Sequence, residues 1–138
     1  MERRFLFLLS SARSGGNSAL LAQAAAAPLP AHALHWIDLS AAQLPPYRDL
    51  RPAAARPEGD LAAIMEAMRA ARGIVIVAPV YWYALPAPAK LLLDHWSGWF
   101  DASETGFAVW AREKTVHLIT TRADPDPTVP DTLEAMVK

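Results

Sequence analysis

Cysteine is absent from all 138 residues of the chain. This absence excludes disulfides, thiolate zinc sites, iron–sulfur clusters and cysteine nucleophiles. The four histidines, at positions 32, 35, 95 and 117, show no spacing typical of a metal site, so we expect no bound metal. Any redox chemistry must therefore come from a bound cofactor.

An excess of charge of one sign is also lacking, because 13 basic and 14 acidic residues give a net charge of −1. A large basic surface for nucleic acid is therefore not expected, although a local basic pocket is still allowed. No stretch approaches the roughly 20 apolar residues needed to span a bilayer. The apolar run at 5–9 is too short for a signal peptide, and Arg13 puts a charge where a cleavage region should be neutral. We expect a cytoplasmic protein with no membrane or nucleic-acid partner.

Hydrophobic residues make up 53% of the chain and charged residues 20%, which is typical of one globular domain, here expected over 1–138. Short apolar runs predict strands at 5–9, 33–39, 74–78 and 115–120. Helices are expected at 19–27, 61–72, 86–96 and 132–137, with a clear helical period in the second. We expect Asn17 or Ser18 near the cap of the first helix, Gly73 as the stop of the second, and a proline-rich loop over 41–60. The alternation predicts an α/β fold with a doubly wound parallel sheet and helices on both faces.

The loop after the first strand, residues 10–18, reads SSARSGGNS. It lies where the carboxyl end of a parallel strand opens onto a ligand crevice. Its two glycines let backbone amides turn inward, and its serines, Asn17 and Arg13 can bind phosphate oxygens. The helix that follows favours an anion at its N-terminus. The loop fits neither the Walker nor the dinucleotide pattern, so it indicates a terminal phosphate monoester or, equally, an ordinary polar turn with a helix cap.

The loop after the third strand, residues 78–86, holds three consecutive aromatic residues between two prolines. Tyr81, Trp82 and Tyr83 could stack on a flat ligand, or they could pack beneath the loop or in a dimer contact. Taken together, one loop suited to a phosphate and one suited to a flat ring predict a mononucleotide such as FMN.

At this point the sequence resembles the NADPH-dependent FMN reductase family. Residues 10–18 resemble that family's phosphate loop, G-S-x-R-x-x-G-N-S/T, with Ser10 in place of the usual glycine. Residues 79–94 resemble its P-x-Y-x-x-x-x-P-x-x-x-K…D segment, and residues 44–47 resemble its proline-rich stretch. Within that segment, Lys90 and Asp94 are either supporting residues of the motif or a simple ion pair along a helix.

The resemblance implies a flavodoxin-like fold with FMN at the carboxyl edge of the sheet. It assigns the cofactor-binding residues to three groups and names no catalytic residue, because the flavin does the chemistry. The phosphate would be held by Ser11, Arg13, Asn17 and Ser18; the ribityl chain and the ring would be bordered by Pro79, Val80, Tyr81, Trp82 and Tyr83; and Thr120, Thr121 and Arg122 would form a third loop.

The activity implied is hydride transfer from NADPH or NADH, through FMN, to a flavin, a quinone or a similar small acceptor. Two alternatives are a flavodoxin-like electron carrier, which would typically be far more acidic, and a flavin-binding module without reductase activity. The family commonly dimerises, and we expect a homodimer or tetramer, with the aromatic residues between Trp96 and Trp110 beside the site and in the interface.

The end of the chain departs from the family pattern. A doubly wound sheet of this class normally has about five strands, and the sequence shows four. We therefore expect a sheet that lacks or truncates its fifth strand, with the fourth strand as an edge. We also expect the natural protein to be longer, and residues after about 122 to be held by few contacts.

Overall fold

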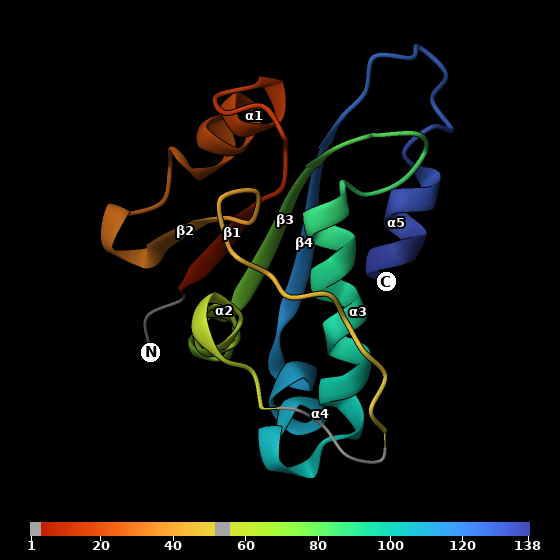
Figure 1. Cartoon of the computed structure of the whole chain (residues 1–138). Coiled ribbons are helices and arrows are strands. Elements are labelled where there is room, and N and C mark those ends of the chain that lie inside the picture. Colours follow the sequence, from red (N-terminus) through yellow and green to blue (C-terminus); the bar gives the residue numbers. More distant parts are fainter. Residues whose placement is uncertain (1–3, 52–55) are drawn as a thin grey trace.

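The computed structural model describes residues 4–51 and 56–138 and shows a four-stranded parallel sheet between two layers of helices (Figure 1). Residues 52–55 of the predicted 41–60 loop lie outside these described residues. The strands are β1 (Phe5–Leu9), β2 (Leu34–Asp38), β3 (Gly73–Pro79) and β4 (Thr115–Thr121), in the order β2-β1-β3-β4. The helices are α1 (Asn17–Ala26), α2 (Gly59–Ala70), α3 (Ala87–Asp101), the short α4 (Phe107–Trp110) and α5 (Asp131–Val137). The predicted α/β class is confirmed.

Alternation along the two central strands divides the core. Leu6 and Leu8 of β1 pack with Ile74 and Ile76 of β3 against α2, α3 and α5. The residues between them, Phe7 and Val75, pack against Ala22 and Ala26 of α1. β1 and β3 are therefore buried on both faces, which explains why their sequences are unbroken apolar runs.

The predicted boundaries needed several corrections. Gly73 does not stop α2; it is the first residue of β3, and a Cβ there would lie 2.7 Å from the ring of Phe5. The cap of α1 is Gly16, so Asn17 and Ser18, which were expected near the cap, are the first two residues of the helix. The third helix continues five residues beyond Trp96 to Asp101, and α4 had no counterpart in the prediction. Close packing and tertiary contacts, which the local pattern does not record, decide these points.

The C-terminal part is partly as expected. Among the described residues β4 pairs only with β3, so it is an edge strand, and its first three residues are exposed. However, Leu133 of α5 is fully buried in the core, Val129 is also buried, and Met136 packs against the same cluster. The expectation of few contacts after residue 122 is therefore wrong for α5. None of the described helices is long and apolar enough to cross a membrane.

Candidate functional site

Three loops meet at the carboxyl edge of the sheet, which is the upper end in Figure 1. They follow β1, β3 and β4, which are neighbours in the sheet, so parallel pairing places their ends together. The hydroxyl oxygens of Ser11 and Tyr81 lie 3.4 Å apart, and the backbone N–H of Val80 donates to the carbonyl of Thr121 over 2.8 Å. The structure therefore brings together the three segments that the sequence singled out.

The loop after β1 ends in an open helix terminus. Gly15 adopts a left-handed conformation (φ +64°), and Gly16 then leads into α1. No side chain caps this terminus, and no acidic residue lies in the first turn of α1. The first amides of a helix have no intrahelical acceptor and carry partial positive charge. This terminus is therefore suited to an anion.

The side chains around that terminus differ in exposure. Arg13 and Asn17 are exposed, and within the part of the chain that the structure describes Arg13 has no ion pair. Ser11 accepts a hydrogen bond from the N–H of Arg13 over 3.1 Å. Ser18 is buried within the first turn of α1. The predicted phosphate-binding roles stay predictions, with Arg13 best placed to pair with a charged ligand.

Ser10, at the root of this loop, is fully buried. Its backbone N–H and its hydroxyl both donate to the carbonyl of Val77, over 3.0 and 2.9 Å respectively. Ser10 therefore ties the start of the loop to the end of β3.

The aromatic loop after β3 is a tight two-residue turn. The backbones of Tyr81 and Ala84 exchange two hydrogen bonds of 3.1 Å, and Trp82 and Tyr83 between them have φ values of 50° and 60°. Positive φ at both central positions is characteristic of a type I′ turn. The exposed fractions are 39% for Tyr81, 94% for Trp82 and 57% for Tyr83. The alternative in which these rings pack beneath the loop therefore fails, most clearly for Trp82.

The end of β4 forms the third border. Thr120 has a buried hydroxyl with no hydrogen-bond partner among the described residues. Thr121 is half-buried and uses its carbonyl to hold Val80, while Arg122 is exposed. Their position at the shared edge agrees with the prediction, and their contact with a ligand stays a prediction.

A cavity of about 710 Å³ lies away from these loops, against α2 and α3. Tyr47, His95 and Trp99 line it, and none of its described lining residues belongs to the predicted site. His95 Nε2 donates to the carbonyl of Pro45 over 2.8 Å, so the loop before α2 is fastened to α3. We place the candidate site at the strand ends nevertheless, because an anion-binding helix terminus and exposed rings converge there.

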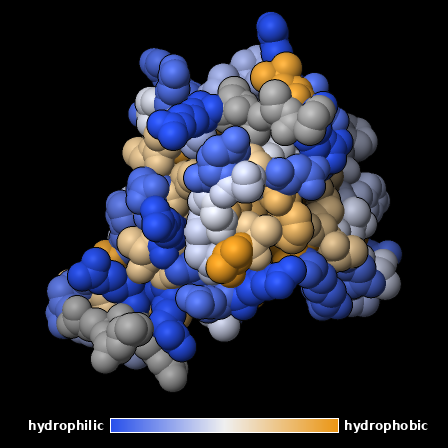
Figure 2. Space-filling model, turned by 90° about the horizontal axis from the view of Figure 1, so that it is seen from below, coloured by the Kyte–Doolittle hydropathy of each residue, from blue (hydrophilic) through white to orange (hydrophobic). Residues whose placement is uncertain are grey.

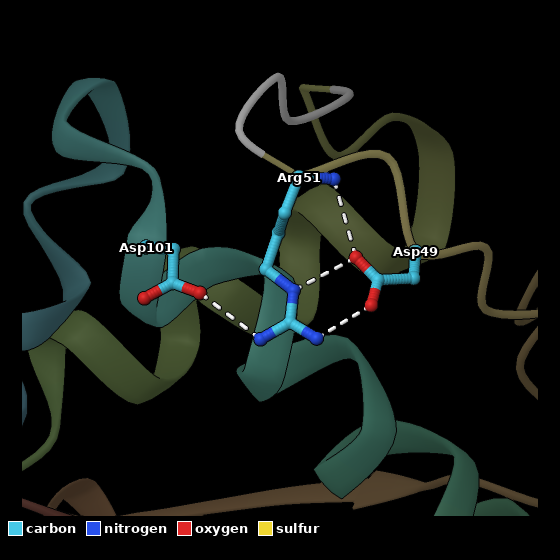
Figure 3. A network of polar contacts seen from close by, with 3 residues as sticks. All are labelled: Asp49, Arg51 and Asp101. Carbon is cyan, nitrogen blue, oxygen red and sulfur yellow. Dashed lines mark hydrogen bonds and ion pairs between the residues drawn. The ribbon is translucent and has the colours of Figure 1, made fainter.

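The same loop is fastened to the far end of α3 by Arg51 (Figure 3). Its Nε donates to Asp49 over 2.7 Å, and its Nη1 donates to Asp101 over 3.1 Å. The hydrogen bonds from Arg51 lower the pKa of Asp49 from 3.8 to about 2. These groups are exposed, so the network contributes little stability and mainly fixes the loop's position. Sequence reasoning missed it.

Lys90 and Asp94 form an ion pair one helical turn apart along α3, and both are exposed. This agrees with the second of the two readings, an ion pair along the helix. It does not test a supporting role toward a ligand.

The aromatic residues from Trp96 to Trp110 do not lie beside the candidate site. Phe107 is buried at the centre of the cluster, with its ring 4.9 Å from that of Trp110 and 5.7 Å from those of Trp96 and Trp99. The cluster gathers at the C-terminal end of α3, opposite the loops (Figure 1), because a 15-residue helix spans about 22 Å. Figure 2, which views this end, shows apolar residues among charged ones. The expectation of a cluster bordering the site was therefore wrong.

Known proteins give an independent view of the chain. The family model described as NADPH-dependent FMN reductase matches residues 3–125. YwqN of Bacillus subtilis, whose name describes an NAD(P)H-dependent FMN-containing oxidoreductase, is 32% identical over 88 residues. That match covers 62% of this chain and 47% of YwqN, so the chain spans about half the length of this relative.

Solved structures agree on the fold. The Trp repressor binding protein of Bacillus subtilis superposes with a TM-score of 0.71 at 19% identity, over 96% of this chain and 74% of the other. The azoreductase AzrA superposes with a TM-score of 0.58 at 17% identity, over 96% of this chain and 79% of AzrA. An NAD(P)H:quinone oxidoreductase of Methanothermobacter marburgensis superposes with a TM-score of 0.51 at 16% identity, over 99% of this chain and 93% of the other. At these identities the likeness shows a flavodoxin-like fold and no more.

Proposed function

Because the chain belongs to the NADPH-dependent FMN reductase family, we propose that it binds FMN at the carboxyl edge of its sheet and uses NAD(P)H to reduce a small acceptor. One observation carries this proposal. The open terminus of α1 and the exposed aromatic turn are held within contact of each other by Ser11 and Tyr81.

The residues present fit the two ends of FMN. A phosphate monoester suits the uncapped terminus of α1, where Arg13, Ser11 and Asn17 would add charged and polar contacts to the free amides. At the other end, Pro79, Val80, Tyr81, Trp82 and Tyr83 would border the ribityl chain and the ring, with residues 120–122 as the third border. When bound, FMN supplies the two-electron chemistry, because its ring can accept a hydride and later reduce a second molecule.

The protein's own groups then act by binding and orientation. The phosphate loop fixes one end of the cofactor, and the turn, stiffened by Pro79 and Pro86, fixes the position of its ring. Backbone amides near the ring would tune its potential. For each quinone reduced to a hydroquinone, one NAD(P)H and one proton are consumed and one NAD(P)⁺ is released.

Steady-state oxidation of NADPH and of NADH, with menadione as acceptor, tests the proposal. FMN-loaded protein is expected to oxidise the nucleotide at a rate that depends on protein and quinone, and removal of FMN is expected to abolish it. Binding of FMN without this oxidation would instead support a flavin-binding module, and one-electron transfer to a partner protein alone would support a carrier. Failure to bind FMN would overturn the proposal altogether.

We also propose that the chain forms a homodimer through the aromatic end of α3 and the start of β4. Phe100, Val109 and Val116 are 54%, 73% and 39% exposed there, beside an apolar cavity of about 390 Å³. Exposed apolar surfaces of this kind mark contact sites between proteins.

Light scattering at micromolar concentration is expected to give about twice the 15.0 kDa of one chain. Phe100→Glu should shift the protein to monomer, because it places a charge in the apolar contact. Leu20→Glu is the matched control, since Leu20 is 56% exposed on α1. A monomeric wild type, or an equal effect of both substitutions, would contradict this interface.

A further inference from the structure

Three basic residues form a row across the amino edge of the sheet, which is the lower end in Figure 1 and lies opposite the candidate site. Arg4, Arg72 and Lys114 each stand one residue before a strand, namely β1, β3 and β4. These strands are parallel neighbours, and their first residues are paired in register. Neighbouring strands lie about 4.8 Å apart, so the backbone of this row spans about 10 Å.

Backbone hydrogen bonds fix the spacing of the row. The carbonyl of Arg4 accepts from the N–H of Arg72 over 2.9 Å and from that of Gly73 over 3.2 Å. The N–H of Thr115 donates to the carbonyl of Arg72 over 3.0 Å. Because the sheet alone holds these residues in place, their side chains are not needed for that purpose.

The row lines a cavity of about 370 Å³, together with Arg69 of α2 and Glu113. Its described lining therefore holds four cationic side chains and one carboxylate, although the whole chain has a net charge of −1. Across residues 4–51 and 56–138, the one ion pair that these four cations form is a contact of 3.8 Å between Arg69 and Glu66. Positive charge is thus concentrated here with little to balance it, as the local basic pocket that the sequence left open would require.

Capping of α2 accounts for one of these cations. The C-terminal carbonyls of a helix carry partial negative charge, which attracts a lysine. The ammonium of Lys114 donates to the carbonyls of Arg69 and Ala71, over 2.6 Å in each case. The side chains of Arg4 and Arg72, by contrast, take part in none of the hydrogen bonds found within the described residues. The fold therefore gives a reason for the lysine and none for the two arginines.

The cations of this cavity disfavour one another. Burial lowers the pKa of Lys114, Glu113 opposes that effect, and Arg72 and Arg69 lower it further. Like charges on neighbouring strands are destabilising in the same way. An anion placed among them would remove this repulsion, and a guanidinium matches the oxygens of a phosphate with two parallel donors.

We propose that the row of Arg4, Arg72 and Lys114 is a binding site for a diphosphate group, carried by a nucleotide or present as free inorganic diphosphate. Several cations spread over about 10 Å suit an extended anion of multiple charge better than one with a single charged centre. The cavity gives such an anion a bounded place to lie. This site is separate from the candidate FMN site and does not depend on the proposed function, because it lies at the opposite edge of the sheet.

Nuclear magnetic resonance of the 15.0 kDa chain tests the site residue by residue. Titration with inorganic pyrophosphate at constant ionic strength should shift the amide signals of residues 4, 72 and 114 in a saturable way. Shifts confined to residues 10–18 would place the anion only at the terminus of α1 and would end the proposal. Because the spectrum separates the two edges of the sheet, a failure to bind FMN leaves this test intact.

Substitutions distinguish a site from general attraction to a basic surface. Arg72→Gln, and independently Arg4→Gln, should weaken pyrophosphate binding roughly tenfold or more, the factor for one charged hydrogen bond. Arg112→Gln is the matched control, because Arg112 is exposed near Lys114 but does not line the cavity. It should change the affinity by no more than about threefold, since a charge outside the site acts only through screened attraction. Equal losses in all three variants would contradict a built site.

Melting temperatures separate binding from a role in the fold. Arg72→Gln should melt at or above the temperature of the wild type, because it removes repulsion. Pyrophosphate should raise the melting temperature of the wild type and of Arg112→Gln, and it should have much less effect on Arg72→Gln. A clear loss of stability in both Arg72→Gln and Arg4→Gln, with pyrophosphate binding retained, would show that the arginines serve the fold.

ADP, AMP and sulfate identify the group that is recognised. ADP should bind at least as tightly as pyrophosphate if the ligand is a nucleotide, and more weakly if it is the free anion. AMP, which has a single phosphate, should bind much more weakly than either. Equal affinity for AMP and ADP, or for sulfate and pyrophosphate, would show that no diphosphate group is recognised here.

Discussion

Arg13→Ala is expected to weaken FMN binding by about 1.5–3 kcal/mol, which is roughly a ten- to hundredfold rise in Kd. Arg13 is exposed beside the uncapped terminus of α1, and the described residues give it no competing ion pair. The loss therefore corresponds to a charged hydrogen bond to the phosphate. Riboflavin, which has no phosphate, should bind far more weakly than FMN and should be insensitive to this substitution.

Isothermal titration calorimetry measures both ligands. Arg48→Ala is the matched control, because Arg48 is also exposed but lies in the loop before α2, against the 710 Å³ cavity. It should leave FMN affinity within about twofold of the wild type, since a distant surface charge is largely screened. Equal affinity for FMN and riboflavin, or equal losses in the two variants, would show that the phosphate is not bound at this loop.

Leu133→Ala is expected to lower the free energy of unfolding by about 2–5 kcal/mol, the range for removing a fully buried leucine side chain. Leu133 is 0% exposed and belongs to the core cluster that includes Leu6 and Leu92. Urea denaturation gives the difference between variant and wild type.

Thr132→Ala, one residue earlier on the exposed face of α5, should change stability by less than about 0.5 kcal/mol. If Leu133→Ala is equally mild, then α5 is not anchored to the core in solution. The sequence-based expectation of a loosely held C-terminal segment would then be right after all.

The strands were the most predictable part of the fold. The run Phe5–Leu9 matches β1 residue for residue, because a strand buried on both faces must be apolar throughout. Helix boundaries were less predictable. Asn17 and Ser18 both look like caps, yet Gly16 takes that position, and Gly73 marks the crowded start of β3 rather than the end of α2. Local residue preference cannot distinguish these cases, because contacts between elements decide them.

For the candidate site, topology was the predictable part. Once strands are parallel and adjacent, the loops after β1 and β3 must meet, and the contact of Ser11 with Tyr81 follows. The conformation of the aromatic turn was not predictable, because Trp82 and Tyr83 adopt backbone angles that their side chains disfavour. The length of α3 was underestimated, and the aromatic cluster was expected beside the site although it lies at the other end of α3.

Ser10 joins the roots of two of the loops that border the candidate site. Its backbone N–H and its hydroxyl both donate to the carbonyl of Val77, two residues before β3 ends at Pro79. A glycine at this position could supply only the backbone bond, because the second bond comes from the serine hydroxyl. The serine found here therefore ties the root of the first loop to β3 by one hydrogen bond more than a glycine would.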